Sequence, residues 1–298
     1  MNKKRTGIVS RILIMLSVVI AIFAGGYFFL DKLIVPKYFG SYGINGVPDL
    51  VGVVTSLYKS PKESKLVTNG FTQTDFSTAV KALQNSNYLI ADDGTIEEKN
   101  FEIFKGNQPV TLTDKEFASI SNKLIDEDGI LLEALPNLNY LNIINISILE
   151  VIITPDKELK DGDKYNGANI SFIAKIDTVD IREQISIQME TPLFLLNMII
   201  PDVLYFEVSY DIDLTKAQDE RVENGEIAIN GRTTEQSEIL MNLLIEFIFP
   251  DEEQMNLPKF TETFGNIILQ GIDVLGEFRF VDGLGISGQQ NGIYVNPV

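Results

Sequence analysis

The first hydrophobic pattern along the chain is an uninterrupted apolar run. Residues 12–30 read ILIMLSVVIAIFAGGYFFL and contain no charged side chain. As a helix this run would be roughly 28 Å long, close to the ~30 Å hydrocarbon core of a bilayer. Its twelve Ile, Leu, Val and Phe residues would favour insertion by roughly 4–7 kcal/mol. The pattern predicts an N-terminal transmembrane helix.

The flanks of this run predict its orientation. Four basic side chains precede it, and two follow it beside Asp31: Lys3, Lys4, Arg5, Arg11, Lys32 and Lys37. The positive-inside rule places the N-terminus in the cytoplasm. We therefore expect a basic cytoplasmic tail (1–11), an anchor (12–30) and a Gly- and aromatic-rich connector (31–46). A cleaved signal peptide is the alternative, because small residues at 24–26 resemble a cleavage site. The apolar run continues beyond those residues, which favours an uncleaved anchor.

Helical spacing follows the connector. Apolar residues recur every three or four positions in 48–59, 72–85 and 113–125. The last of these opens with a capping box, Thr113 and Glu116, which would satisfy amides at the helix start. We expect residues 47–110 to form a small, mostly helical segment.

The period then changes from helical to alternating. Residues 143–154, 168–178, 181–191, 203–214 and 225–231 alternate or run apolar as strands do. Ile170, Phe172, Ala174 and Ile176 would share one face, and Leu204 to Leu214 repeat the pattern. The segment between 178 and 181 is interpreted as a hairpin turn. These features predict an antiparallel sheet with one apolar face.

Helical spacing returns near the C-terminus. We expect helices over 233–249, beginning with a Thr233–Gln236 capping box, and over 258–275, followed by short strands at 277–281 and 292–295. The predicted fold is α+β: a transmembrane helix, then an extracytoplasmic domain (111–298) in which a curved antiparallel sheet packs on helices.

Charge changes this picture in one respect. The first 38 residues carry six basic and one acidic side chain, whereas the whole chain has a formal net charge of −18, which leaves −23 for the remainder. Phosphates would be repelled, so we expect no nucleic-acid partner. An anionic lipid surface should also be disfavoured.

Composition excludes several kinds of chemistry. The chain has no Cys, His or Trp. Disulfides, zinc–thiolate sites, thiol nucleophiles, the Ser-His-Asp triad and the HExxH zinc site are all impossible without these residues. We expect no catalytic residues, no metal and no cofactor.

Three acidic clusters are the remaining candidates for polar chemistry: Asp92-Asp93, Asp126-Glu127-Asp128 and Asp251-Glu252-Glu253. Adjacent carboxylates on loops usually face water, which is the favoured interpretation. Asp161-Gly162-Asp163 lacks the rest of an EF-hand pattern, so a solvated turn is favoured over a calcium loop.

The segment 191–206 (TPLFLLNMIIPDVLYF) is the most unusual apolar stretch of the domain. It is too short to span a bilayer. A buried core strand or short helix is the plainer interpretation. The alternative is an apolar lining or rim that contacts a lipid or a protein, with a Met for adaptable packing. The proposed ligand contacts are Leu193, Phe194, Leu196, Met198 and Ile199.

The order of elements adds a resemblance. An anchor, then LTDKEFASISNKL (112–124), IPDVLYFEVSYDIDL (200–214) and FVDGLGISGQQNGIYV (280–295), is similar to the membrane-anchored tubular lipid-binding or AsmA-like extracytoplasmic domains of Gram-positive bacteria. The resemblance covers 8–30 and about 110–298, and rests on patterning. It implies a long curved sheet wrapped around a helix to enclose an apolar groove, and it implies no catalytic residue.

The leading hypothesis is a non-enzymatic, single-pass membrane protein of the cell envelope that binds a lipid or another apolar ligand. The second is an envelope scaffold or protein-interaction module in which the sheet faces are ordinary core. The third is a histidine-free enzyme on envelope polymers, which requires Asp92, Asp126 or Asp251 to line a closed pocket with a raised pKa.

Overall fold

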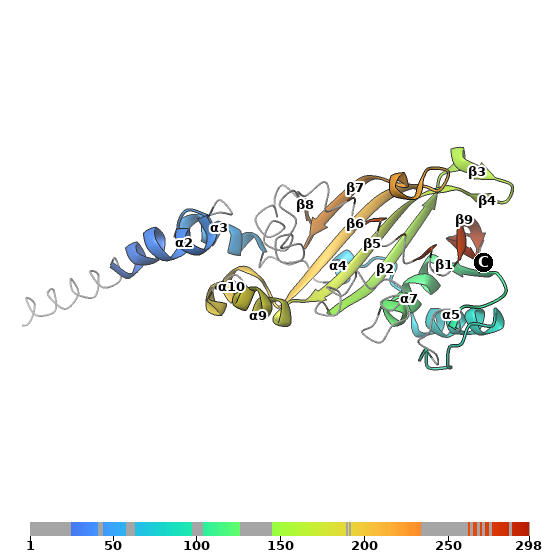
Figure 1. Ribbon diagram of the computed structural model, residues 1–298, viewed down its shortest axis with the longest axis horizontal. Helices are drawn as coiled ribbons and strands as arrows, with labels where there is room; N and C mark the ends of the chain where they lie inside the picture. The colour runs from blue at the N-terminus through green and yellow to red at the C-terminus, as the bar shows by residue number, and fades with distance from the viewer. Residues whose placement is uncertain are drawn as a thin grey trace, which may run out of the picture. The chain divides into compact units, whose positions relative to one another are not determined.

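A computed structural model describes residues 25–40, 44–57, 63–96, 104–125, 145–188, 190, 192–233, 262, 265–266, 269, 272–273, 276–285 and 288–297 (Figure 1). The chain divides into two compact units, Met1–Tyr58 and Lys59–Val298. Each unit is described by itself.

The first unit is helical. Residues 25–29 are α-helical and continue into a π-helical turn, η1 (Leu30–Ile34), and into α2 (Val35–Phe39). The expected connector is therefore helical through its first half. A third helix, α3 (Val47–Leu57), begins beside η1, because the Asp31 Oδ1 atom accepts a hydrogen bond from the Val47 amide at 2.7 Å.

That contact requires glycine at position 46. A Cβ atom on Gly46 would lie 2.4 Å from Asp31 Oδ1. Lys32 forms an ion pair with the other Asp31 oxygen at 2.9 Å. The start of α3 is thus fixed to the first residue after the predicted membrane span.

The predicted span itself is only partly covered by the structure. Residues 12–24 lie outside the described residues, and residues 25–30 are helical as expected. Within the described ranges, no helix combines the length and the apolar character needed to cross a membrane.

The second unit contains two antiparallel sheets. The first has the order β1 (Val110–Thr113), β10 (Gln290–Asn296), β9 (Glu277–Leu284), β4 (Lys164–Tyr165) and β3 (Lys160–Asp161). The second has the order β2 (Asn145–Pro155), β5 (Gly167–Asp177), β6 (Val203–Asp213), β7 (Val222–Ile229) and β8 (Arg232–Thr233). Short helices accompany them: α4 (Glu63–Leu66), η4 (Lys157–Leu159) and η5 (Gln218–Glu220). The predicted α+β class with antiparallel sheets is confirmed.

The second sheet, hereafter the long sheet, has the predicted apolar face. Register pairs Ile170 with Tyr210 and Phe172 with Val208, and all four side chains are buried. The C-terminal helical residues pack on this face, since a Cβ atom on Gly265 would lie 2.9 Å from the Tyr210 ring. Alternation of apolar and polar residues predicted these strands correctly because only one face is buried.

Strand β2 forms one edge of the long sheet, and side chains protect it. A β-bulge interrupts β2 between Ile148 and Glu150. The Asn122 amide bonds both backbone groups of Ile148, at 2.6 and 3.1 Å. Asn291 donates to the Ile153 carbonyl at 2.7 Å. These contacts occupy groups that would otherwise pair with another strand.

Helices α5 (Gln73–Asn85) and α7 (Asp114–Ile125) form where predicted. The Thr113 amide donates to Glu116 at 2.8 Å, and the Glu116 amide donates to Thr113 Oγ1 at 3.2 Å, so the predicted capping box is confirmed. Helix α7 packs against α5 and β2. Residues 63–110 therefore pack within the second unit.

Two linked predictions are wrong. The hairpin turn predicted between residues 178 and 181 is absent, because Val179 and Asp180 already belong to a helix. Residues 181–191 do not form a strand: α9 (Val179–Gln188) occupies most of this segment, followed by α10 (Leu193–Ile199). Ile181 and Ile185 are buried, whereas Ile187 is 74% exposed. Burial thus follows helical spacing, and the alternation of Ile185, Ile187 and Met189 misled the strand prediction.

Other predictions fall on positions that the structure does not describe. These are the helix over 234–249 with Gln236, and the clusters at 126–128 and 251–253. Thr233 itself ends β8. Of the helix predicted over 258–275, the described residues are helical: Glu262, Gly265, Asn266, Leu269, Ile272 and Asp273.

Candidate functional site at the helical end of the long sheet

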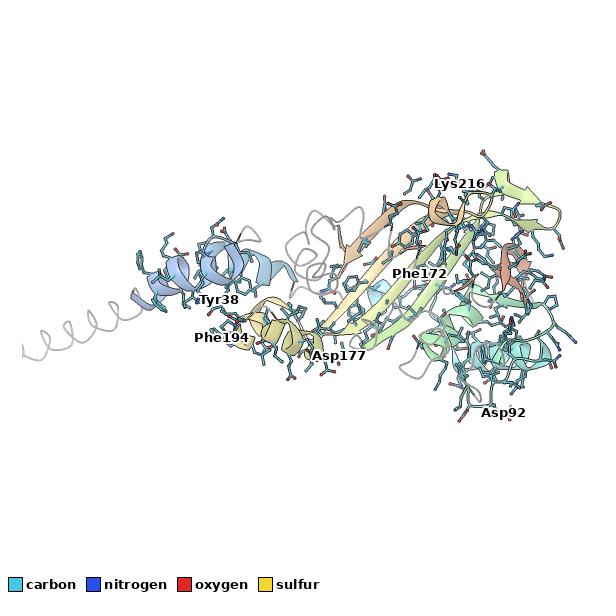
Figure 2. All side chains as sticks on the ribbon, viewed as in Figure 1. Tyr38, Asp92, Phe172, Asp177, Phe194 and Lys216 are labelled. Carbon is cyan, nitrogen blue, oxygen red and sulfur yellow. The ribbon has the colours of Figure 1, made fainter. Side chains whose placement is uncertain are left out.

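The candidate site is the helical insert, residues 178–202, between β5 and β6. Register pairs Asp177 with Val203 at this end of the long sheet and Gly167 with Asp213 at the other. The eleven-residue strands between the two ends span roughly 36 Å. Figure 2 shows Phe194 and Asp177 toward one end of the sheet and Lys216 toward the other.

Local hydrogen bonds start the first helix of the insert. The Val179 amide donates to Asp177 Oδ1 at 3.0 Å, and the Arg182 amide donates to the Thr178 carbonyl at 2.9 Å. A side-chain acceptor just before the helix satisfies an amide that has no helical partner. The sequence Asp177-Thr178 therefore ends β5 and begins α9.

A clasp holds the two helices to the sheet. The Arg182 side chain is buried and donates through Nη1 to the Ile200 carbonyl at 3.0 Å, and through Nη2 to Asp202 Oδ1 at 2.6 Å. The Thr178 hydroxyl donates to the Pro201 carbonyl, and the Thr178 amide donates to the Asp202 carbonyl at 3.0 Å. These contacts join the beginning of the insert to its end.

The inner side of the insert is a small core. Five apolar side chains are almost completely buried there: Ile181, Ile185, Leu195, Leu196 and Ile200. The insert is consequently a packed element, and its surface side chains have defined positions.

Its exposed side carries several large apolar side chains, beside polar ones such as Asp180, Glu183 and Asn197. Phe194 is 57% exposed, Val179 42% and Leu193 37%, in addition to Ile187. Six large apolar residues are exposed among the described residues of the second unit, and four of them lie in this insert; the others are Leu89 and Ile152. A concentration of exposed apolar surface on a packed element typically marks an interaction site.

The five predicted ligand contacts are not equivalent. Leu193 and Phe194 are exposed at the start of α10, whereas Leu196 is fully buried in the core of the insert. Met198 and Ile199 belong to α10, but their side chains lie outside the described residues. Sequence reasoning missed Ile187 and Val179, and a helical rather than an alternating period over 179–188 would have indicated them.

Helix α4 is attached near this insert. Glu63 lies at the start of α4, and its carboxylate accepts a hydrogen bond from the Tyr205 hydroxyl at 3.1 Å. Tyr205 is close to the beginning of β6, where the insert ends. The helical end of the long sheet is therefore also the end at which α4 is attached.

The segment after α4 is held by a buried carboxylate. Glu150 is 1% exposed and accepts hydrogen bonds from the amides of Thr68 and Asn69, at 3.0 and 2.7 Å. Burial raises the pKa of the nearby Asp114, and the charge of Glu150 adds to this rise. The role of Glu150 is structural, because backbone amides of the same chain occupy both of its oxygens.

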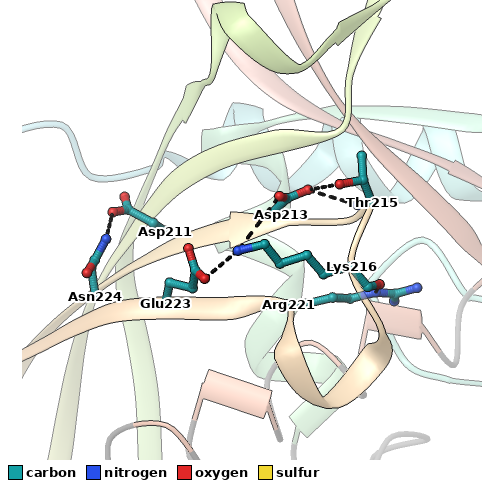
Figure 3. Close-up of polar contacts among 7 residues, drawn as sticks. All are labelled: Asp211, Asp213, Thr215, Lys216, Arg221, Glu223 and Asn224. Carbon is teal, nitrogen blue, oxygen red and sulfur yellow. Dashed lines mark hydrogen bonds and ion pairs between the residues drawn. The ribbon is translucent and has the colours of Figure 1, made fainter.

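The opposite end of the long sheet is polar (Figure 3). Lys216 forms ion pairs with Glu223 and, at 4.0 Å, with Asp213. Arg221 forms an ion pair with Asp273 at 3.1 Å. Asp211 accepts from Asn169 and Asn224, at 2.9 Å each. These side chains satisfy one another, which is typical of a stabilised surface.

Hydrogen bonds shift the pKa values of three side chains at this polar end. The amide of Asn169, followed by that of Asn224, lowers the pKa of Asp211. The Thr215 hydroxyl lowers the pKa of Asp213, and the bond to Glu223 raises the pKa of Lys216. Each of these three shifts favours the charged form of its group, whereas burial raises the pKa of Asp273, which is paired with Arg221.

The acidic candidates give no reaction centre in the described part of the chain. Asp92 is exposed and accepts a hydrogen bond from Gln84 at 3.1 Å. Asp161 and Asp163 lie in the exposed β3–β4 turn, where Gly162 has a φ of +66°. Among the described residues, no cluster of three acidic side chains has the arrangement of a metal site.

Comparison with known proteins adds no relative. No protein-family model, no curated protein and no solved structure matches this chain.

Proposed function

We propose that the chain is a membrane-tethered, non-enzymatic protein of the cell envelope that binds a lipid or another apolar ligand through its helical insert. The observation that carries this proposal is the exposure of Ile187, Leu193 and Phe194 on a packed and clasped element. Polar side chains at these positions would cost the fold little, so the presence of exposed apolar side chains supports a binding role.

The tether and its orientation are part of the proposal. The uncharged run over 12–30 and the basic residues before it support a single-pass anchor with a cytoplasmic N-terminus. The domain would then be extracytoplasmic. The curved, groove-forming sheet implied by the resemblance stays a prediction.

Two observations support a binding role over catalysis. The sequence has neither His nor Cys, which removes the commonest general base and the thiol nucleophile. Asp92 is one of the three carboxylates that the enzyme hypothesis requires in a closed pocket, and it faces solvent. A protein-interaction module of the envelope is the second candidate, because an exposed apolar surface can also bind a protein.

Binding of a fluorescent fatty-acid probe to the purified full chain tests the proposal. Leu193→Ser combined with Phe194→Ser should weaken binding about tenfold or more, because two apolar contacts of about 1.5–3 kcal/mol each at full burial are reduced. Leu89→Ser is a matched control, because Leu89 is 38% exposed against 37% for Leu193 but lies outside the insert. It should bind as the unaltered chain does.

The anchor is present in all three proteins, so probe bound to the anchor cancels in the comparison. Equal binding by the double variant and the control would contradict the proposal. Loss of a specific protein partner from the double variant, with unchanged probe binding, would favour the interaction module instead.

A further inference from the structure

We propose that the tip of the helical insert, formed by Ile187, Leu193 and Phe194, enters the interface of the same bilayer that the tether crosses. This inference rests on the proposed tether and names the surface to which the insert binds. It gives the protein a second membrane contact, distinct from the anchor.

The geometry of the insert places these side chains at its tip. Helix α9 leaves the sheet after Asp177, and α10 returns to it at Asp202. Ile187 lies at the end of α9, and Leu193 and Phe194 lie at the beginning of α10. They therefore surround the turn between the helices, which is the part farthest along the chain from both strands.

The length of chain between the predicted span and α4 is short. The Val47 amide at the start of α3 donates to Asp31, the first residue after the predicted span, and α3 is about 16 Å long. Only residues 58–62 separate α3 from Glu63, a distance of roughly 20 Å when extended. Glu63 in turn binds Tyr205, near the insert.

The anchor also raises the effective concentration of the tip at the membrane, which offsets the weak binding expected of only three side chains. Linking two binding elements gives the second one an effective concentration of roughly millimolar order. Three exposed apolar side chains would bind a bilayer weakly and reversibly by themselves. Held by the anchor, the same tip would contact the interface more often than it would on an untethered domain.

The charges around the tip limit its depth and its choice of lipid. Glu190 lies in the turn itself, and Asp180 and Glu183 are exposed on α9. The one basic side chain of the insert, Arg182, is buried against Asp202. We therefore expect entry to the level of the headgroups and upper acyl chains, with zwitterionic lipid preferred over anionic lipid.

Single cysteines can test this inference, because the chain contains none of its own. The full chain is reconstituted in phosphatidylcholine vesicles, with an environment-sensitive fluorophore at Ile187→Cys or Phe194→Cys. Asp161→Cys, in the β3–β4 turn at the opposite end of the sheet, is the control. Quenching is measured with aqueous iodide and with lipid carrying a nitroxide on its acyl chain.

We expect iodide quenching at positions 187 and 194 to be about fivefold weaker than at 161, and nitroxide quenching to be confined to 187 and 194. Adding phosphatidylglycerol should reduce the protection, and Glu190→Gln should increase it. Protection that disappears when the protein is diluted in excess lipid would indicate a second copy as the partner and overturn the inference.

Iodide access at 187 and 194 equal to that at 161 would also overturn it. If the double serine variant still weakened probe binding in that case, the proposed function would stand without the membrane contact. Vesicles that failed to retain the chain at all would instead contradict the tether itself.

Discussion

The two ends of the long sheet differ in the side chains that they expose to solvent. At the helical end, the buried Arg182 holds a packed insert that exposes Ile187, Leu193 and Phe194. At the polar end, Lys216 and Arg221 are paired with carboxylates, and Asp211 is held by two amides. A surface whose polar groups satisfy one another needs no partner, whereas exposed apolar groups on a rigid element gain free energy from one.

Loss of the clasp should have the largest effect on stability. Arg182→Ala removes a buried side chain and leaves the Ile200 carbonyl without its donor, so we expect a loss of about 2–4 kcal/mol in the free energy of unfolding. Asp202→Asn should cost less than about 1 kcal/mol, because the Asp202 side chain is 79% exposed. Urea unfolding followed by circular dichroism measures both. Similar values for the two variants would mean that the insert is not clasped as described.

Loss of the buried carboxylate should have the next largest effect. Glu150→Gln replaces an oxygen that accepts from backbone amides by an NH₂ group, at an expected cost of about 1.5–3 kcal/mol. Glu207→Gln is the control: it lies on the same sheet, and its buried Oε1 atom has no hydrogen-bond partner. Its replacement should be neutral or slightly stabilising. The same unfolding experiment would contradict this prediction if Glu207→Gln were the more damaging change.

Acidification should lower the local stability of the polar end before that of the helical end. The pKa values of Asp211 and Asp213 are lowered in the folded state, so their contribution is present above the ordinary value of 3.8 and is lost as pH falls below it. Both groups are partly exposed, so solvent screening should keep the loss within about 1 kcal/mol. Hydrogen exchange measured between pH 5 and pH 3 should accelerate in residues 209–224 after correction for the intrinsic rate. Equal acceleration in residues 179–200 would remove the proposed difference between the ends.

The smallest change in stability should accompany the largest change in binding. Phe194→Ser is expected to alter the free energy of unfolding by less than about 0.5 kcal/mol, because the side chain is mostly exposed. Thermal unfolding should therefore be unchanged while probe binding falls. A clear drop in stability would assign Phe194 to the core and weaken its assignment to the binding surface.

Much of this fold follows from local patterning. Strands β5 and β6 alternate because one face is buried, and the Thr113–Glu116 box fixes the start of α7 within a few residues. Helix α9 could not be predicted in the same way. Ile185, Ile187 and Met189 suit a strand, and the burial of Ile181 together with the clasp by Arg182 makes the segment a helix.

The sequence predicted the location of the candidate site, but not which of its side chains are exposed. The apolar run after Pro192 indicated its location, but the phase of α10 decides that Phe194 is exposed and Leu196 is buried. Contacts between distant positions gave no signal in the sequence. Glu150 lies 82 positions from Thr68, and Arg221 lies 52 positions from Asp273.

Photocrosslinking with a lipid that carries a photoactivatable acyl chain tests the central claim most directly. The full chain in a bilayer would be irradiated, digested and mapped by mass spectrometry. The account predicts crosslinks in the anchor and in residues 187–194, and none in residues 156–166 or 213–224. Crosslinks confined to the anchor, or equally frequent at both ends of the long sheet, would contradict it.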